Sequence, residues 1–355
     1  MTGVTLLSRT RPGSGRQERG RIGEAAAVLT KLKRLARAFF WGGATWMALL
    51  PLLWQMAGEH EWFLVLCQYA PPVLYALAWL KLVGLAALSR PRRAWLGLLP
   101  PLLWFVLVLL PFRTHKSETG DFSVLSWNIQ AGLSGPEKIA QVLAETKADV
   151  IALQEARVPS AQPGGVDPLP AILKALNCQV ARGGERGELV ILSRLAMWSQ
   201  RLHNLGGLSQ ALEQPLERDG KVIHIIDVHL MTGDPQGILR DEPAVSRKRV
   251  LLSAATRRVQ ADSLTRVVQN IKDPVVLLGD FNLPPSSIAY RTLSSSLTDT
   301  FAEAGWGWGL SYPASCPFWR IDYIWCKGLT PVSCQVLALP GSDHRALLCH
   351  FKVGP

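Results

Sequence analysis

Three long apolar stretches, almost free of charged residues, lie within the first third of this 355-residue chain. They run from Phe39 to Met56, from Trp62 to Leu88 and from Ala94 to Phe112. A helix needs about 20 apolar residues to cross a bilayer core about 30 Å thick, so each stretch is close to the required length. We therefore predict a membrane anchor of three transmembrane helices over residues 39–112. The alternative is the buried helical core of a soluble protein.

The charges that flank these stretches predict their orientation. The tail at residues 1–38 holds nine Lys and Arg against two Glu, the loop Gly58–Glu61 is acidic, and the loop Ser89–Arg93 is basic. Because cytoplasmic loops are enriched in Lys and Arg, we expect a cytoplasmic amino terminus. Three crossings then place the rest of the chain outside a bacterial inner or plasma membrane. A cleavable signal peptide fits poorly, because the tail is long and two more apolar stretches follow the first.

The basic charge of the chain belongs mainly to its membrane end. A net charge of +11 and a pI of about 9.6 are typical of nucleic-acid binders. Residues 1–112 contain 13 Lys and Arg against 4 Asp and Glu, so they carry +9 of the +11 and leave +2 for residues 113–355. The overall charge is therefore no argument for a nucleic-acid partner.

After a linker at residues 113–121, residues 122–355 have the alternating pattern of a globular domain. Helix patterns cover Pro136–Lys147 and Ala244–Lys272. Eight strand-like runs are FSVLSWNI, DVIALQEA, ELVILSR, VIHIIDVHL, PVVLLGDFN, RIDYIWC, VSCQVLAL and ALLCHFKV. Strands first paired with helices and later in near succession predict an α+β fold, in which two β-sheets pack face to face with helices outside.

The six cysteines form no CxxC pair and no zinc-ligand spacing with histidines. A structural zinc site is therefore disfavoured. In an extracytoplasmic domain, a pair such as Cys316–Cys326 or Cys334–Cys349 could oxidise. The other interpretation is that these thiols are buried and pack as small apolar groups.

Two further features have more than one interpretation. The second predicted helix contains a basic group that is typical of a solvated face, with a phosphate-binding stripe as the alternative. Its members are Arg247, Lys248, Arg249, Arg257 and Arg258. Trp306 and Trp308 could line the rim of a substrate site or pack under a sheet edge.

Polar side chains stand where the predicted strands end. Asn128 closes the first run, Glu155 the second, His229 the fourth, and Asp280 and Asn282 the fifth. A carboxylate at the end of a buried strand is costly unless it is paired, so such residues usually bind a metal, a partner or a substrate. Each alone also has a local explanation, such as capping a turn.

Six short motifs containing these residues follow one another in a fixed order. They are Ser-Trp-Asn128, Leu-Gln-Glu155, Asp-x-His229-Leu, Gly-Asp280-Phe-Asn282, Arg320-Ile-Asp322-Tyr and Gly-Ser342-Asp343-His344. This order resembles the endonuclease/exonuclease/phosphatase superfamily, which includes deoxyribonuclease I. The resemblance spans about Phe122–Val353 and implies a four-layer α/β/β/α sandwich that hydrolyses phosphate esters.

The resemblance also implies a divalent metal, Mg²⁺ or Mn²⁺. A cation neutralises charge on the phosphoryl oxygens, and hard oxygen ligands suit Mg²⁺. We predict Glu155 as the main metal ligand, Asn128 as a residue that orients the site, and Asp343 as a support on the metal side.

The remaining motif residues receive catalytic roles. His344 is the predicted general base, because imidazole titrates near neutral pH, and Asp322 is predicted to bond its other nitrogen and fix the tautomer. By resemblance, Asp280 orients or helps to deprotonate the attacking water, while Asn282 and His229 hold phosphoryl oxygens. The division of labour between Asp280 and His344 is open at this point.

The substrate class also stays open. The superfamily's abasic-site endonucleases carry an acid two positions after the asparagine, where this chain has Gln130, which disfavours a DNA-repair role. We expect a phosphate-ester substrate, either a nucleic acid or a lipid headgroup or other small phosphoester, and the sequence implies no protein partner. A non-catalytic binding module is disfavoured, because every core motif is present.

Overall fold

The computed structural model describes residues 14–104, 106, 120–157, 167–185, 187–207, 209–233 and 242–354. The chain divides into two compact units. One consists of Met1–Pro51 and Val73–Leu107, and the other of Leu52–Pro72 and Val108–Pro355. A short segment from between the first two apolar stretches therefore belongs to the same unit as the globular domain. Most of the predicted linker at 113–121 lies outside the described residues.

The first unit is helical. Its helices are α1 (Ser14–Ala57), whose last residues belong to the other unit, α3 (Pro72–Ser89) and α4 (Trp95–Trp104). Among the described residues, α3 is the one helix that is long and apolar enough to cross a membrane, judged by length and composition alone, and α4 is apolar but shorter. The three predicted spans are thus matched by one qualifying helix, and the other two remain predictions.

The second apolar stretch, Trp62–Leu88, is not one helix. It forms α2 (Trp62–Gln68) and α3, separated at Tyr69–Pro71. Pro71 and Pro72 explain the break, because proline lacks an amide hydrogen and disfavours helical conformation in the residue before it. Pro72 is tolerated as the first residue of α3, where no intrahelical donor is needed.

The second unit is built on two mixed β-sheets. The first has the order β12-β13-β1-β2-β4-β3, with the bounds β1 (Phe122–Asn128), β2 (Val150–Gln154), β3 (Gln179–Gly183), β4 (Leu189–Ser193), β12 (Thr330–Leu337) and β13 (Ala346–Lys352). The second has the order β10-β11-β9-β8-β7-β5, and β6 pairs with β7. Its bounds are β5 (Ala196–Met197), β6 (Arg201–Gly206), β7 (Ser209–Arg218), β8 (Lys221–His229), β9 (Val275–Asp280), β10 (Thr298–Asp299) and β11 (Asp322–Lys327).

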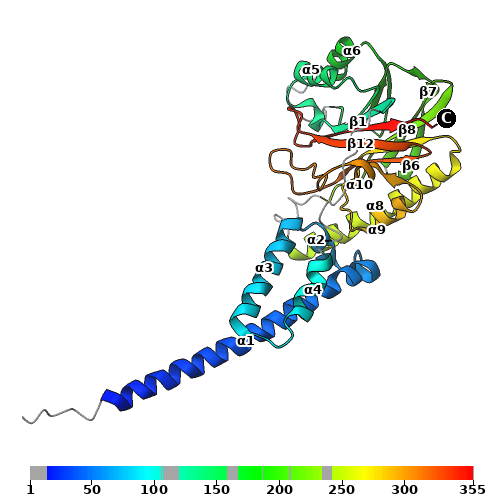
Figure 1. Ribbon diagram of the computed structural model, residues 1–355. Helices are drawn as coiled ribbons and strands as arrows, with labels where there is room; N and C mark the ends of the chain where they lie inside the picture. The colour runs from blue at the N-terminus through cyan, green and yellow to red at the C-terminus, as the bar shows by residue number, and fades with distance from the viewer. Residues whose placement is uncertain are drawn as a thin grey trace, which may run out of the picture. The chain divides into compact units, whose positions relative to one another are not determined.

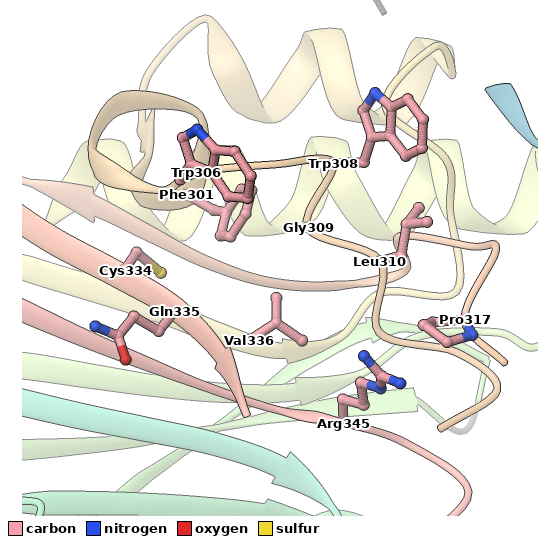
Figure 2. Close-up of a pocket in the computed structure, with 10 residues that line it drawn as sticks. All are labelled: Phe301, Trp306, Trp308, Gly309, Leu310, Pro317, Cys334, Gln335, Val336 and Arg345. Atoms are coloured by element: carbon pink, nitrogen blue, oxygen red, sulfur yellow. The ribbon is translucent and has the colours of Figure 1, made fainter. Parts of the chain in front are cut away.

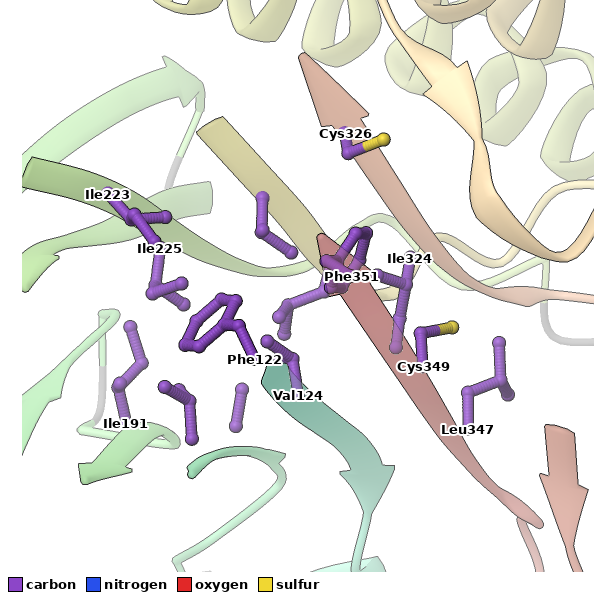
Figure 3. Close-up of a cluster of buried hydrophobic side chains, with 14 of the residues drawn as sticks. Phe122, Val124, Ile191, Ile223, Ile225, Ile324, Cys326, Leu347, Cys349 and Phe351 are labelled. Atoms are coloured by element: carbon purple, nitrogen blue, oxygen red, sulfur yellow. The ribbon is translucent and has the colours of Figure 1, made fainter. Parts of the chain in front are cut away.

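The helices cover the outer faces of this sandwich (Figure 1). The first sheet is covered by α5 (Pro136–Thr146) and α6 (Leu169–Leu176), and the second by α8 (Pro243–Asn270) and α9 (Ile288–Ser294). The short helix α10 (Thr300–Ala304) follows β10. The space between the sheets is filled by apolar side chains from both, among them Phe122, Ile225 and Phe351 (Figure 3). The predicted arrangement of two packed sheets with flanking helices is confirmed.

All eight predicted strand runs contain a strand, and both predicted helices are present as α5 and α8. The prediction missed β3, β5, β6, β7 and β10. Strand β7 was missed because its buried centre is Glu213-Gln214-Pro215, which has none of the apolar alternation by which strands are recognised. Helix α6 was not predicted either.

One of the two candidate cysteine pairs is bonded. Cys334 in β12 and Cys349 in β13 lie directly opposite in the antiparallel register, and they form a disulfide. Cys316 and Cys326, the other candidate pair, are both free. Adjacent antiparallel strands bring the first pair together, whereas Cys316 lies in an exposed loop and Cys326 in a buried strand.

Glu213 in β7 is held by histidines from both neighbouring strands. Its side chain is buried, His224 Nδ1 lies 2.7 Å from Oε1, and His203 Nε2 contacts Oε2. Burial by itself raises the pKa of Glu213, but the hydrogen bonds and charges of the two histidines outweigh it and lower the pKa to about 2.

We predict that Glu213→Gln lowers the stability of the domain by about 2 kcal/mol near neutral pH, after allowance for screening. A depressed pKa stabilises the fold above the unfolded-state value of about 4.5, and this contribution is lost as pH falls toward 2. The difference in Tm from wild type, measured by thermal unfolding of the detergent-solubilised chain, should therefore shrink below pH 4.5. Glu217→Gln, at an exposed position of the same strand, is the control. A pH-independent loss in Glu213→Gln would contradict the assignment.

Candidate active site

The strand registers bring the predicted site residues to one rim of the sandwich. In the second sheet, β8 and β9 are parallel and pair His229 with Asp280, and the antiparallel β11 places Asp322 opposite Asp280. In the first sheet, β1 and β2 are parallel, so Asn128 lies opposite Gln154 and Glu155 follows directly. The ends of five strands therefore meet at one place, as the sequence predicted.

Asp280 is the centre of this group. Its Oδ2 accepts a hydrogen bond of 3.2 Å from Asn128 Nδ2 and lies 3.7 Å from both His229 Nε2 and His344 Nε2. Burial is the main cause that raises the pKa of Asp280, and the neighbouring Asp322 carboxylate raises it further. The two imidazoles act in the opposite direction.

His344 and Asp322 form the predicted pair. His344 Nδ1 lies 3.0 Å from Asp322 Oδ2, and the ring packs at 4.6 Å between centroids against Tyr312. Burial alone would lower the pKa of His344, but the carboxylates of Asp322 and Asp280 raise it to about 10. At neutral pH the ring therefore holds a proton on each nitrogen, and its Nε2 faces Asp280.

Asn128 presents its amide nitrogen to the site. The Gln130 backbone N–H can only donate, and it donates to Asn128 Oδ1, which fixes the amide orientation. Nδ2 then donates to Glu155 Oε1 at 3.0 Å as well as to Asp280. Asn128 therefore orients the Glu155 carboxylate, and its own oxygen is engaged by the backbone.

Two neighbouring sets of oxygens could hold a divalent cation. Glu155, the predicted ligand, is partly exposed, and only its Oε1 is held by Asn128. Asp343 lines the same cavity, and burial raises the pKa of its carboxyl. Within the described residues, one buried trio also brings its ligand atoms within 4.8 Å of one another: Asp280, Asp322 and His344. The carboxylate oxygens of this trio fit Mg²⁺ or Mn²⁺, whereas the His344 nitrogen could act as a ligand only after losing a proton.

Sequence reasoning missed a hydrogen bond that supports this rim. Gln154 at the end of β2 donates to Asp227 of β8 at 2.6 Å, so the bond joins the two sheets. Both residues belong to the motifs described above: Gln154 directly precedes Glu155, and Asp227 lies two positions before His229. Burial raises the pKa of Asp227 well above its usual value, against the opposing effect of the hydrogen bond from Gln154. The sequence did contain a signal for this bond, because Gln154 and Asp227 are polar residues inside otherwise apolar strands.

The site residues open into a cavity of about 290 Å³. Its walls include most of the predicted residues: Glu155, His229, Asp280, Asn282, Asp343 and His344. Arg257 of α8 also lines the cavity, with only 3% of its surface exposed, and donates to the Met231 carbonyl at 2.9 Å. The expectation that the basic residues of this helix are a solvated face is therefore wrong for Arg257, because the loop after β8 covers it.

The two loop tryptophans lie elsewhere. Trp306 and Trp308 line a separate hollow with Leu310, Val336 and Arg345, and this hollow shares no lining residue with the catalytic cavity (Figure 2). The structure therefore gives no support to their interpretation as a rim of the catalytic site.

The sequence of this chain matches a known protein family over the region that contains these residues. The sequence profile of the Endonuclease/Exonuclease/phosphatase family matches residues 125–344, more than half of the chain. The chain belongs to this family. Members are hydrolases of phosphate esters, and the matched range begins within β1 and ends at His344. Among curated proteins, none matches the chain significantly.

Solved structures share the fold at low sequence identity. An endonuclease/exonuclease/phosphatase family protein from Bacteroides thetaiotaomicron has a TM-score of 0.51 at 15% identity, covering 65% of this chain and 97% of its own. Humanized D. rerio TDP2 has a TM-score of 0.51 at 16% identity, covering 65% and 98%. The mannosyl-6-phosphatase of B. thetaiotaomicron VPI-5482 has a TM-score of 0.50 at 15% identity, covering 65% and 99%.

We predict that Asp322→Asn lowers kcat for a chromogenic phosphodiester by about 10²-fold or more and changes KM little. The neutral amide of the variant would not stabilise a positive charge on His344, and it would not fix a proton on Nδ1 as the Asp322 carboxylate does. Because both residues act as one unit, the Asp322→Asn, His344→Ala double variant should be no slower than His344→Ala alone. Steady-state kinetics of the three variants test this, and multiplicative effects in the double variant would contradict the pairing.

Proposed function

We propose that this protein is a metal-assisted hydrolase of phosphate esters. The observation that supports it best is the buried Asp280 carboxylate. Three side chains from separate parts of the chain approach it at one rim: Asn128 of β1, His229 of β8 and His344 of the loop before β13. A buried carboxylate with two imidazoles and a second carboxylate beside it is suited to moving a proton next to an anionic centre.

Glu155, with Asp343 on the same side, would hold a divalent cation, which would supply positive charge for the phosphoryl oxygens. Asn128 holds the Glu155 carboxylate in place through its amide nitrogen. His229, whose Nε2 lies 3.8 Å from Glu155 Oε1, faces the same cavity and can donate to a phosphoryl oxygen. Asn282 lines that cavity as well, and its backbone N–H donates to Asp280 Oδ1 at 3.0 Å.

Asp280 activates the water, and the His344–Asp322 pair donates a hydrogen bond beside it. The water oxygen bonds to phosphorus, its proton passes to Asp280, and the ester oxygen leaves with its electron pair. His344 is held with Nδ1 on Asp322, so its Nε2–H can donate to a phosphoryl or leaving oxygen. Before His344 could serve as the general base expected from sequence, its ring would have to lose a proton. We therefore assign to Asp280, rather than to His344, the main role in accepting the proton of the attacking water.

We predict that the full chain in detergent hydrolyses a p-nitrophenyl phosphodiester with Mg²⁺ or Mn²⁺ and loses this activity in EDTA. Asp280→Ala and His344→Ala should each lower kcat by about 10²–10⁴-fold. His350→Ala, in β13 outside the cavity, is the control. Turnover of Asp280→Ala near the wild-type rate would overturn the assignment.

Nuclease activity is the second candidate. It is favoured by a structural neighbour, D. rerio TDP2, which was solved with a single-stranded DNA product. The near-neutral charge of residues 113–355 weighs against it, because nucleic-acid sites are generally basic. Nicking of plasmid DNA by wild type, absent in His344→Ala, would establish it.

We further propose that the catalytic domain is extracytoplasmic. Residues from Glu59 to Tyr69 pack on this domain within one unit, so both lie on the same side of any membrane. If α3 crosses a bilayer, the chain between α3 and β1 must cross back, which agrees with the predicted third span. The basic loop Ser89–Arg93 then faces the cytoplasm, and the Cys334–Cys349 disulfide fits an oxidising compartment.

We predict that alkaline phosphatase fused after Pro355 is active in bacterial cells, because this reporter folds only outside the cytoplasm. The same reporter fused after Arg93 should be inactive, and a green fluorescent protein fused there should fluoresce. A fluorescent fusion at Pro355 would contradict the proposed orientation.

A further inference from the structure

The segment between the first two apolar stretches is firmly attached to the catalytic domain. Glu59 Oε1 accepts a hydrogen bond of 2.7 Å from the Ile288 backbone N–H, and Glu59 Oε2 lies 3.5 Å from Arg258 Nε. The Arg247 guanidinium lies 4.9 Å from the centroid of the Trp62 ring. Two of the basic residues of α8 therefore hold this segment in place.

The attachment extends to the catalytic loop itself. Tyr69 donates through its hydroxyl to the Asn282 carbonyl at 2.7 Å, and its own carbonyl accepts a bond of 2.7 Å from Trp319 Nε1. Asn282 has a positive φ of 52°, a conformation that needs support from its surroundings in a residue other than glycine. Tyr69 supplies part of that support from outside the matched family region.

Helix α2 gives the catalytic cavity an apolar wall. Val65 is buried against Val250 and Ala254 of α8, and Leu66 packs beside it. Val65, Leu66 and Tyr69 line the same cavity as Asp280 and His344. A hydrated phosphate group gains nothing from contact with aliphatic side chains, whereas a hydrocarbon chain is stabilised there by about 0.8 kcal/mol for each methylene removed from water.

Chain connectivity ties this wall to the apolar helix. Tyr69 is followed after two residues by Pro72, where α3 begins, the helix with the length and composition of a membrane span. Three residues cover at most about 10 Å. Tyr69, which forms part of the cavity wall, is therefore at most about 10 Å along the chain from the first residue of α3, where this helix can enter a bilayer. At the surface of a bilayer, the phosphate esters are those of the lipid headgroups.

We propose that the substrate is a phosphate ester of an amphiphile, a membrane lipid, whose phosphate lies at Asp280 and His344 and whose first methylenes contact Val65 and Leu66. Arg257, a buried cation on the same cavity, adds attraction for the anionic headgroup. The cavity of about 290 Å³ accommodates a headgroup with a few carbon atoms, and lies at the small end of the range for ligand sites. This inference rests on the proposed phosphoesterase function.

The test uses the full chain in detergent with Mg²⁺ and two substrates, p-nitrophenyl methyl phosphate and p-nitrophenyl hexyl phosphate. Both carry one negative charge and release the same p-nitrophenolate, so they differ only in the alkyl chain. We expect kcat/KM to be at least about tenfold higher for the hexyl ester, roughly the effect of burying two methylenes. Leu66→Gln should reduce this ratio severalfold. The matched control is Leu252→Gln, at a position of α8 that is 63% exposed and outside the cavity, which should keep the wild-type ratio.

The possible results separate the two proposals. Hydrolysis of both esters at equal kcat/KM, lost in His344→Ala, would leave the phosphoesterase function standing and overturn the lipid inference. Plasmid nicking without chain-length preference would overturn it in favour of a nuclease. Absence of any His344-dependent hydrolysis would overturn the phosphoesterase function, and the lipid inference with it.

Discussion

Two hydrogen bonds cross between the sheets at the catalytic rim, and the geometry of the site depends on them. Asn128 of β1 donates to Asp280 of β9, and Gln154 of β2 donates to Asp227 of β8. Sheets packed only by apolar side chains can slide, because dispersion and hydrophobic contacts are not directional. Buried polar pairs at fixed distances set the position of one sheet on the other, and thereby the distance between Glu155 and Asp280.

The segment from Glu59 to Tyr69 gives this member of the family a feature that its profile does not include, since the match begins at residue 125. It lies on α8 through ion-pair, ring and apolar contacts, and reaches the catalytic loop through Tyr69. Residues after 113 alone would lack this wall and the hydroxyl that holds the Asn282 carbonyl. The unit that contains the candidate site is therefore larger than the matched family region, and enzyme assays should use the full chain.

The strands that were predicted correctly have uniform apolar runs, such as Val275–Leu278 before Asp280, and their ends identified most of the site. Strand β7 was missed because Glu213 and Gln214 are buried in it. His203 and His224 contact the Glu213 carboxylate, and the Gln214 amide donates to backbone carbonyls, so the polar groups of both residues are satisfied. The break in the second apolar stretch was marked by Pro71 and Pro72. The prediction passed over that signal because α2, like a membrane span, contains no charged residue.

The sequence by itself determined the family and the separation of a basic, apolar amino-terminal part from a nearly neutral globular one, and it predicted the polar residues that meet at the rim of the sandwich. These properties follow from local patterns: residue types at strand ends, runs of apolar residues and the distribution of charge. Tertiary structure decided the rest, including the bonding of Cys334 to Cys349, the burial of Arg257 and the position of α2 on the cavity. Each depends on contacts between residues far apart in the chain, which no local pattern specifies.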